Sequence, residues 1–156
     1  KDAVTASLLL TEMAAWYYSQ GMTLFDALEA LFKKYGWYGE KTHNLVMPGL
    51  DGVEKMANLM KSLRETPPSE IAGVKVVTYK DYQDGTARDA ASGTVTKIAL
   101  AGSNVLRFEL SDGTHIVVRP SGTEPKIKVY ILTKGADAAE RDANLAKYSA
   151  WVATLA

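Results

Sequence analysis

The first 36 residues carry apolar positions at helical spacing in two successive segments. Asp2 is suited to cap a helix that runs to about Gln20, with Gly21 as its C-terminal stop. Thr23 then caps a second helix, which ends at Gly36. The first segment is apolar on most sides, a pattern typical of a helix buried inside a larger body. We therefore expect this helical pair to pack against further polypeptide that precedes it.

The middle of the chain alternates between strand-like and helical patterns. Residues 41–47 are expected to form a strand that Pro-Gly ends, and residues 51–64 a helix that Thr-Pro-Pro ends. A short β-rich run follows at residues 74–79. Residues 80–93 are polar and contain an Asp-Gly pair, so we expect an exposed loop there. Residues 94–100 are expected to form another short strand.

The last third of the chain predicts a hairpin, one more strand and a final helix. Apolar runs at residues 105–110 and 114–118 flank Asp112-Gly113, a strong hairpin signal. A further strand ends near Thr133, and residues 136–155 are helical with one apolar face. This order predicts an α+β fold, an antiparallel sheet with helices packed on one face. We place a domain boundary near Tyr38, with residues 1–38 before it and 39–156 after it.

Composition and charge argue against several classes of binding partner and of cellular location. An apolar share of 47% is sufficient for a packed core. Eighteen basic residues balance eighteen acidic ones, which argues against broad electrostatic binding to nucleic acid or to an anionic membrane. No apolar run is long enough to span a bilayer, and no signal peptide is recognisable. Cysteine is absent, which fits a cytoplasmic protein and excludes a thiolate metal site.

The stretch with the clearest chemistry is a turn between two apolar runs, residues 119–125, which read Arg-Pro-Ser-Gly-Thr-Glu-Pro. Arg119 offers a planar fork of donors that matches phosphate or carboxylate oxygens. Ser121 and Thr123 add hydroxyl donors, and Gly122 has no side chain to block a close approach of the backbone. Successive turn amides can also point at one anion. The same residue types are ordinary turn formers, so composition alone leaves both interpretations open.

The contiguous string, continued by Lys126-Ile127-Lys128, closely resembles the phosphate-binding loop of the α-D-phosphohexomutases. That family includes phosphoglucomutases and phosphomannomutases, and the loop lies in its last domain. Residues 1–36 resemble the final helices of the preceding, third α/β domain of the family. The resemblance covers nearly the whole chain, is weaker at residues 81–102, and is nearest to bacterial phosphoglucomutases.

The resemblance implies a role in binding for this part of the enzyme. Its contacts to the non-reacting phosphate of a phosphorylated hexose would be Arg119, Ser121, Gly122 and Thr123. Lys128 would add to the positive field near the loop, or would lie on the solvated side of its strand. The full-length protein is then expected to be an isomerase, an intramolecular phosphotransferase that interconverts hexose 1-phosphate and hexose 6-phosphate through a bisphosphate.

The family's reacting groups are expected elsewhere. The chain has no Ser-His pair and no Asp-Gly-Asp-Gly-Asp string, so we expect no catalytic residue and no metal ligand in it. Mg²⁺ and glucose 1,6-bisphosphate would serve the full-length phosphoprotein, and the fragment alone would be inactive. Glucose is the favoured hexose and mannose the alternative. A stand-alone module that binds a phosphorylated ligand without catalysis remains a competing class. The first helix, whose pattern is that of a buried helix, argues against it, because a free module would not expose an apolar helical pair.

Overall fold

A computed structural model describes residues 2–155 of the chain. The chain separates into two compact units, Lys1–Trp37 and Tyr38–Ala156, each of which is described by itself.

The first unit consists of two helices whose ends are set by side-chain caps. Helix α1 spans Ala3–Ser19, and α2 spans Leu24–Tyr35. The Asp2 carboxylate accepts a hydrogen bond from the Thr5 amide at 2.9 Å. Thr23 and Asp26 form a reciprocal capping box at the start of α2. Both predicted helices are confirmed. No residue of α1 is buried, and its exposed apolar side chains include Val4 and Trp16.

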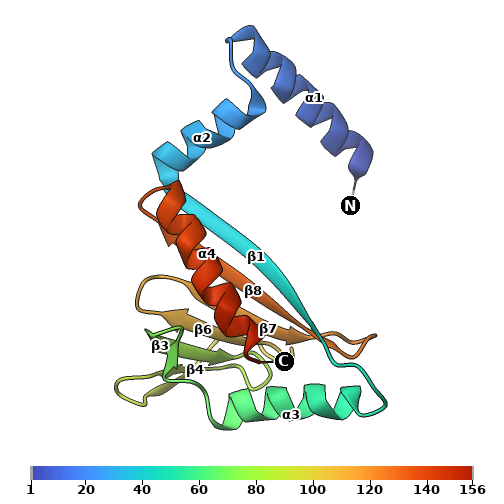
Figure 1. The fold of residues 1–156 in the computed structure, drawn as a ribbon, viewed down its shortest axis with the longest axis vertical. Coiled ribbons are helices and arrows are strands. Elements are labelled where there is room, and N and C mark those ends of the chain that lie inside the picture. The colour runs from blue at the N-terminus through green and yellow to red at the C-terminus, as the bar shows by residue number, and fades with distance from the viewer. Residues whose placement is uncertain (1, 156) are drawn as a thin grey trace. The chain divides into compact units, whose positions relative to one another are not determined.

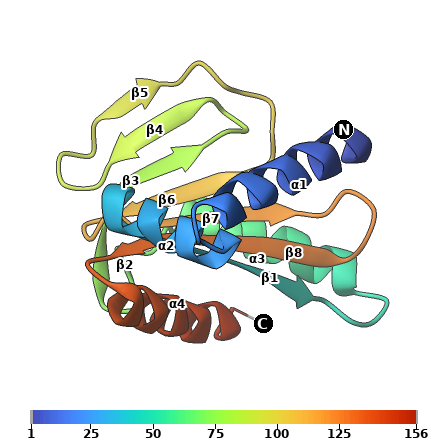
Figure 2. The ribbon, with the colours of Figure 1, turned by 90° about the horizontal axis from the view of Figure 1, so that it is seen from above.

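The second unit is built on an eight-stranded sheet in which seven strands follow the order β1-β8-β7-β6-β3-β4-β5 and the eighth, β2, pairs with β3. Every strand pairing with an assigned register is antiparallel. Figures 1 and 2 show two helices, α3 and α4, beside the sheet, and the β3–β4–β5 end lies away from α4. The strands are β1 (Trp37–Val46), β2 (Glu70–Ile71), β3 (Val74–Asp81), β4 (Thr86–Asp89), β5 (Val95–Lys97), β6 (Leu106–Leu110), β7 (His115–Pro120) and β8 (Lys126–Gly135); the helices are α3 (Gly52–Glu65) and α4 (Ala138–Ala153).

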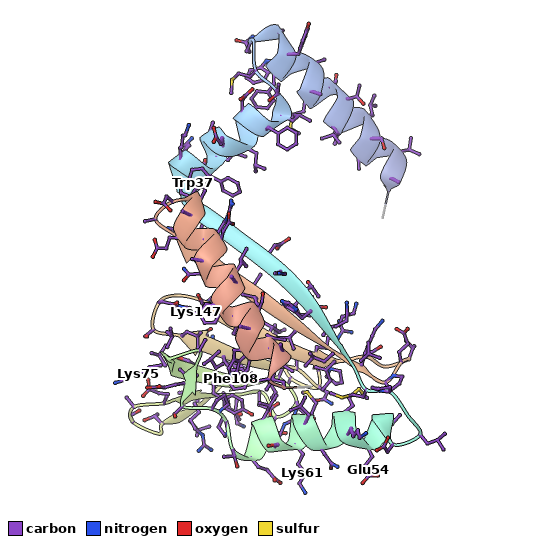
Figure 3. All side chains as sticks on the ribbon, viewed as in Figure 1. Trp37, Glu54, Lys61, Lys75, Phe108 and Lys147 are labelled. Carbon is purple, nitrogen blue, oxygen red and sulfur yellow. The ribbon has the colours of Figure 1, made fainter. Side chains whose placement is uncertain are left out.

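The core forms between one face of the sheet and these two helices. Alternate side chains of β6, β7 and β8 are buried, while the intervening ones face outward. Phe108 lies in this layer, and Lys61 and Glu54 project from the outer side of α3 (Figure 3). The predicted α+β fold, with helices on one face of an antiparallel sheet, is confirmed. The buried cluster joins the sheet to α3 and α4 through Met60, Leu63, Phe108, Ile116, Val129, Tyr148 and Val152.

The predicted hairpin is confirmed, but the predicted loop at residues 80–93 is wrong. Strands β6 and β7 pair with Glu109 opposite His115, and Gly113 in their turn has φ 80°. In residues 80–93, β3 continues to Asp81, and Thr86–Asp89 forms β4. The polar composition of this segment suggested that its side chains are exposed, but Asp81 is buried, with 3% of its surface exposed. The first strand of the unit also starts earlier than predicted, and the strand expected at residues 94–100 is limited to β5.

Candidate anion-binding groove

The loop that carries the candidate site joins β7 to β8 at one end of the sheet. The final register pairs are Arg119 opposite Lys128 and Pro120 opposite Ile127. The Ser121 amide then donates to the Lys126 carbonyl at 2.9 Å, which closes the base of the loop. Within it, the Thr123 amide points at the Ser121 Oγ at 3.4 Å. The sheet therefore sets the spacing of the loop's ends, and short-range hydrogen bonds shape its interior.

The connection between β1 and α3 contacts the base of this loop. The Met47 amide donates to the Pro125 carbonyl at 2.8 Å. Gly52, the first residue of α3, lies so close that an added Cβ would be 2.2 Å from the Met47 carbonyl oxygen and 3.2 Å from the Pro125 Cβ. Only glycine fits there without a shift of the backbone. The start of α3 is therefore packed tightly against the base of the loop (Figure 1).

Two cations face each other across the strands at the start of this loop. Arg119 and Lys128 are direct antiparallel partners, and such side chains lie on the same face of a sheet. Glu124, the loop's carboxylate, pairs instead with Lys126, whose hydrogen bond and charge hold the pKa of Glu124 below its usual range. Within residues 2–155, no hydrogen bond or ion pair engages the Arg119 guanidinium. Like charges placed opposite each other destabilise a sheet unless an anion lies between them.

A groove of about 610 Å³ opens beside the loop, at the end of the sheet where β6 begins and β7 ends. Its volume lies within the usual range of small-molecule sites. Arg119, Ser121 and Gly122, three of the predicted site residues, line it. Thr123 is exposed, and neither it nor Lys128 contributes to the lining. The remaining walls come from α3 and from the segment before β6, through Val53, Met56, Ala57, Met60, Ser103, Asn104 and Val105.

Sequence patterns gave no sign of these other walls. Arg64 and Asn104, whose side chains meet near the groove, are 40 positions apart in the chain. The Arg64–Asp81 ion pair connects α3 to β3, and β3 in turn pairs with β6, which begins just after Asn104. In the part of the chain that the structure describes, no three His, Asp or Glu side chains gather as a metal site would require. Nor does any described helix have the length and apolar character needed to cross a membrane.

Comparisons with known proteins point to one family. The sequence model described as "Phosphoglucomutase/phosphomannomutase, C-terminal domain" matches residues 55–145. A phosphoglucomutase of Staphylococcus epidermidis is 34% identical over 131 residues, which is 84% of this chain and 24% of that protein. A phosphoglucomutase of Staphylococcus aureus is 36% identical over 137 residues, 88% of this chain and 25% of that protein.

A solved structure of parafusin, a phosphoglucomutase from Paramecium in an open form, aligns with a TM-score of 0.46 and 19% identity, over 85% of this chain and 23% of that one. The chain spans about a quarter of the length of the curated relatives it matches. The family match covers more than half of the chain and includes most of α3, the hairpin and the candidate loop. This chain therefore belongs to the phosphoglucomutase/phosphomannomutase family, in the part that forms the C-terminal domain.

Proposed function

We propose that this chain is the phosphate-gripping part of a phosphohexomutase that interconverts glucose 1-phosphate and glucose 6-phosphate through a bisphosphate. The observation that carries the proposal is the Arg119 guanidinium, which no described residue pairs with and which lies opposite Lys128 and on the wall of the groove. A phosphate dianion between these cations would relieve their repulsion and accept charge-assisted hydrogen bonds. The names of the relatives, all phosphoglucomutases among those compared, support glucose over mannose.

The loop's other residues have distinct parts in this proposal. The hydroxyl of Ser121 donates to a phosphate oxygen from the groove wall, and Thr123 does so from the exposed tip. Gly122 has open space where a Cβ would project, so the ligand can approach its main chain. Lys128 acts through its charge and not as a wall of the groove. Holding the non-reacting phosphate orients the sugar, which is how positioning lowers the barrier to phosphoryl transfer.

The proposal assigns bond-making to the rest of a cytoplasmic enzyme, so that the chain alone binds and does not catalyse. Residues 1–38 would complete the preceding domain, and residues 39–156 would form the phosphate-binding domain. Mg²⁺ would stabilise the charge of the phosphoryl group in transit. The described residues gather no set of carboxylates that fits this ion. Its ligands would therefore lie in the other domains of the whole protein, which are the partners of this chain. Glucose 1,6-bisphosphate would be the intermediate and activator.

The test is a kinetic comparison in the whole protein that contains this chain. Arg119→Ala removes charge-assisted hydrogen bonds that are each worth about 1.5–3 kcal/mol, so we expect KM for glucose 1-phosphate to rise roughly tenfold to hundredfold. Arg88→Ala, which removes an exposed arginine from β4, is the matched control and should leave KM unchanged. An Arg119→Ala enzyme with normal KM would exclude the proposed grip. Mannose 1-phosphate in the same assay separates the two hexoses.

A further inference from the structure

The wall of the groove that includes Asn104 is firmly anchored to the main chain of a neighbouring segment. The Ser103 amide donates to the Tyr82 carbonyl at 3.1 Å, and the Tyr82 amide donates to the Val105 carbonyl at 3.0 Å. Two hydrogen bonds therefore bracket Asn104. A wall held in this way loses little conformational entropy when a ligand contacts it.

The Asn104 side chain is itself held by a buried ion pair. Arg64, near the end of α3, donates from Nε to the Asp81 Oδ2 at 2.6 Å and from Nη2 to the Asn104 Oδ1 at 2.9 Å. Asp81 is buried, and its Oδ1 accepts from the Gln83 amide at 2.9 Å. The ion pair thus fixes the orientation of the guanidinium, and the hydrogen bond from the guanidinium in turn orients the amide of Asn104.

This contact decides which end of the Asn104 amide faces Arg64. A guanidinium can only donate hydrogen bonds, so Asn104 must turn its carbonyl oxygen toward Arg64. Its Nδ2, which carries two donors, then points away from Arg64. Among residues 2–155 no hydrogen-bond partner engages that Nδ2, although Asn104 lines the groove. Both Nδ2 donors of this exposed, groove-lining side chain are therefore open to a ligand.

We propose that Asn104 is a substrate-binding residue whose amide donates to a hydroxyl oxygen of the hexose, with Arg64 as its positioning residue. The inference rests on the proposed function, in which Arg119 holds the phosphate. Arg119, at the end of β7, and Asn104, just before β6, both line the groove, and the pairing of Leu106 with Val118 makes the two segments neighbours. The groove's volume is sufficient for a sugar as well as its phosphate.

Two substitutions separate binding by Asn104 from a merely structural role. Asn104→Asp keeps an oxygen for Arg64 but removes both donors, so the wall stays anchored while the ligand contact is lost. Asn104→Ala removes the donors and the contact with Arg64 and adds no charge. In the whole protein we expect either change to raise KM for glucose 1-phosphate about threefold to tenfold, the effect of losing one hydrogen bond. Melting of Asn104→Asp should match that of the wild type.

The matched control is Asn44→Asp, the same chemical change on the exposed strand β1 away from the groove lining, which should leave KM unchanged. Inorganic phosphate serves as the probe that lacks a sugar. Its inhibition constant should stay within about twofold in Asn104→Ala, because a neutral change on the hexose side leaves the grip of Arg119 intact.

Three results would overturn the inference. A normal KM in Asn104→Asp would reduce Asn104 to an anchor for Arg64. Equal weakening of inorganic phosphate and glucose 1-phosphate by Asn104→Ala would refute a contact with the sugar. A change in KM no larger than that of Asn44→Asp would remove any role in binding. Arg119→Ala, measured in parallel, keeps the two proposals apart: a normal KM there would refute the phosphate grip itself.

Discussion

Removing the Tyr148 hydroxyl should destabilise the second unit in a way that depends on pH. Tyr148 is fully buried in α4, and its hydroxyl donates to the Asp112 Oδ2 in the hairpin turn between β6 and β7. The other oxygen of Asp112 accepts from the Thr114 amide at 2.9 Å. This contact links the last helix to the end of the central hairpin, so Tyr148→Phe removes the link without changing the packing of the ring.

The magnitude follows from the charge and exposure of the acceptor. A hydrogen bond to a charged group contributes about 1.5–3 kcal/mol. The Asp112 side chain is 30% exposed, so water recovers part of the lost interaction and the lower half of that range applies. We therefore expect Tyr148→Phe to lower the free energy of unfolding at pH 7 by about 1.5–2 kcal/mol. Tyr38→Phe, which removes a hydroxyl from an exposed ring, is the control and should change it little.

The pH dependence has a definite sign. Burial raises the pKa of Asp112, but the hydrogen bonds from Tyr148 and Thr114 outweigh it and hold the pKa below the ordinary 3.8. A carboxyl whose folded pKa is lowered adds stability above its unfolded pKa, and that stability is lost as pH falls through the folded pKa. The deficit of Tyr148→Phe should therefore be complete at pH 7 and should shrink below about pH 4.

Native-state hydrogen exchange of the buried β7 amides measures this free energy in the intact protein. The wild type, Tyr148→Phe and Tyr38→Phe would be compared at pH 7 and near pH 3. A deficit below about 0.5 kcal/mol at pH 7 would refute the strength assigned to the contact. A deficit of equal size at both pH values would show that the carboxylate charge has no part in it.

Two further substitutions test the supports of the groove. Gly52→Ala would place a Cβ 2.2 Å from the Met47 carbonyl oxygen, so we expect a loss of about 1–3 kcal/mol in stability and weaker binding of inorganic phosphate by calorimetry. Arg64→Leu leaves the buried carboxylate of Asp81 without its cation and should cost roughly 3 kcal/mol in chemical unfolding. Lys61→Ala, at an exposed pair on the same helix, should change stability by less than about 0.5 kcal/mol.

Each of these predictions has a contradicting outcome. A Gly52→Ala protein with wild-type stability would mean that the β1–α3 connection yields easily and does not support the loop. Equal losses of stability in Arg64→Leu and Lys61→Ala would mean that the buried Arg64–Asp81 ion pair contributes no more to the free energy of unfolding than an exposed pair does.

Local chemistry in the sequence was sufficient for the helix ends, the hairpin and the loop. Asp2 and Thr23 cap their helices because a short polar side chain reaches the free amides of the first turn. Asp112-Gly113 forms the hairpin turn because glycine tolerates the φ of 80° found there. The contiguous residues 119–125 carried the family resemblance, which the comparisons confirm. Contacts between near neighbours decide all of these features.

Tertiary structure alone decided the groove and its second wall. Residues 80–93 read as an exposed loop, yet β3 and β4 form there because Asp81 is buried against Arg64 and adjacent strands satisfy the main chain. The pairing of Arg119 with Lys128 depends on the register of β7 and β8. Asn104 meets Arg64, 40 positions away, because Arg64 of α3 pairs with Asp81 of β3 and β3 pairs with β6. Sequence patterns record the preferences of near neighbours, whereas a groove is formed by distant segments that meet only when the sheet is complete.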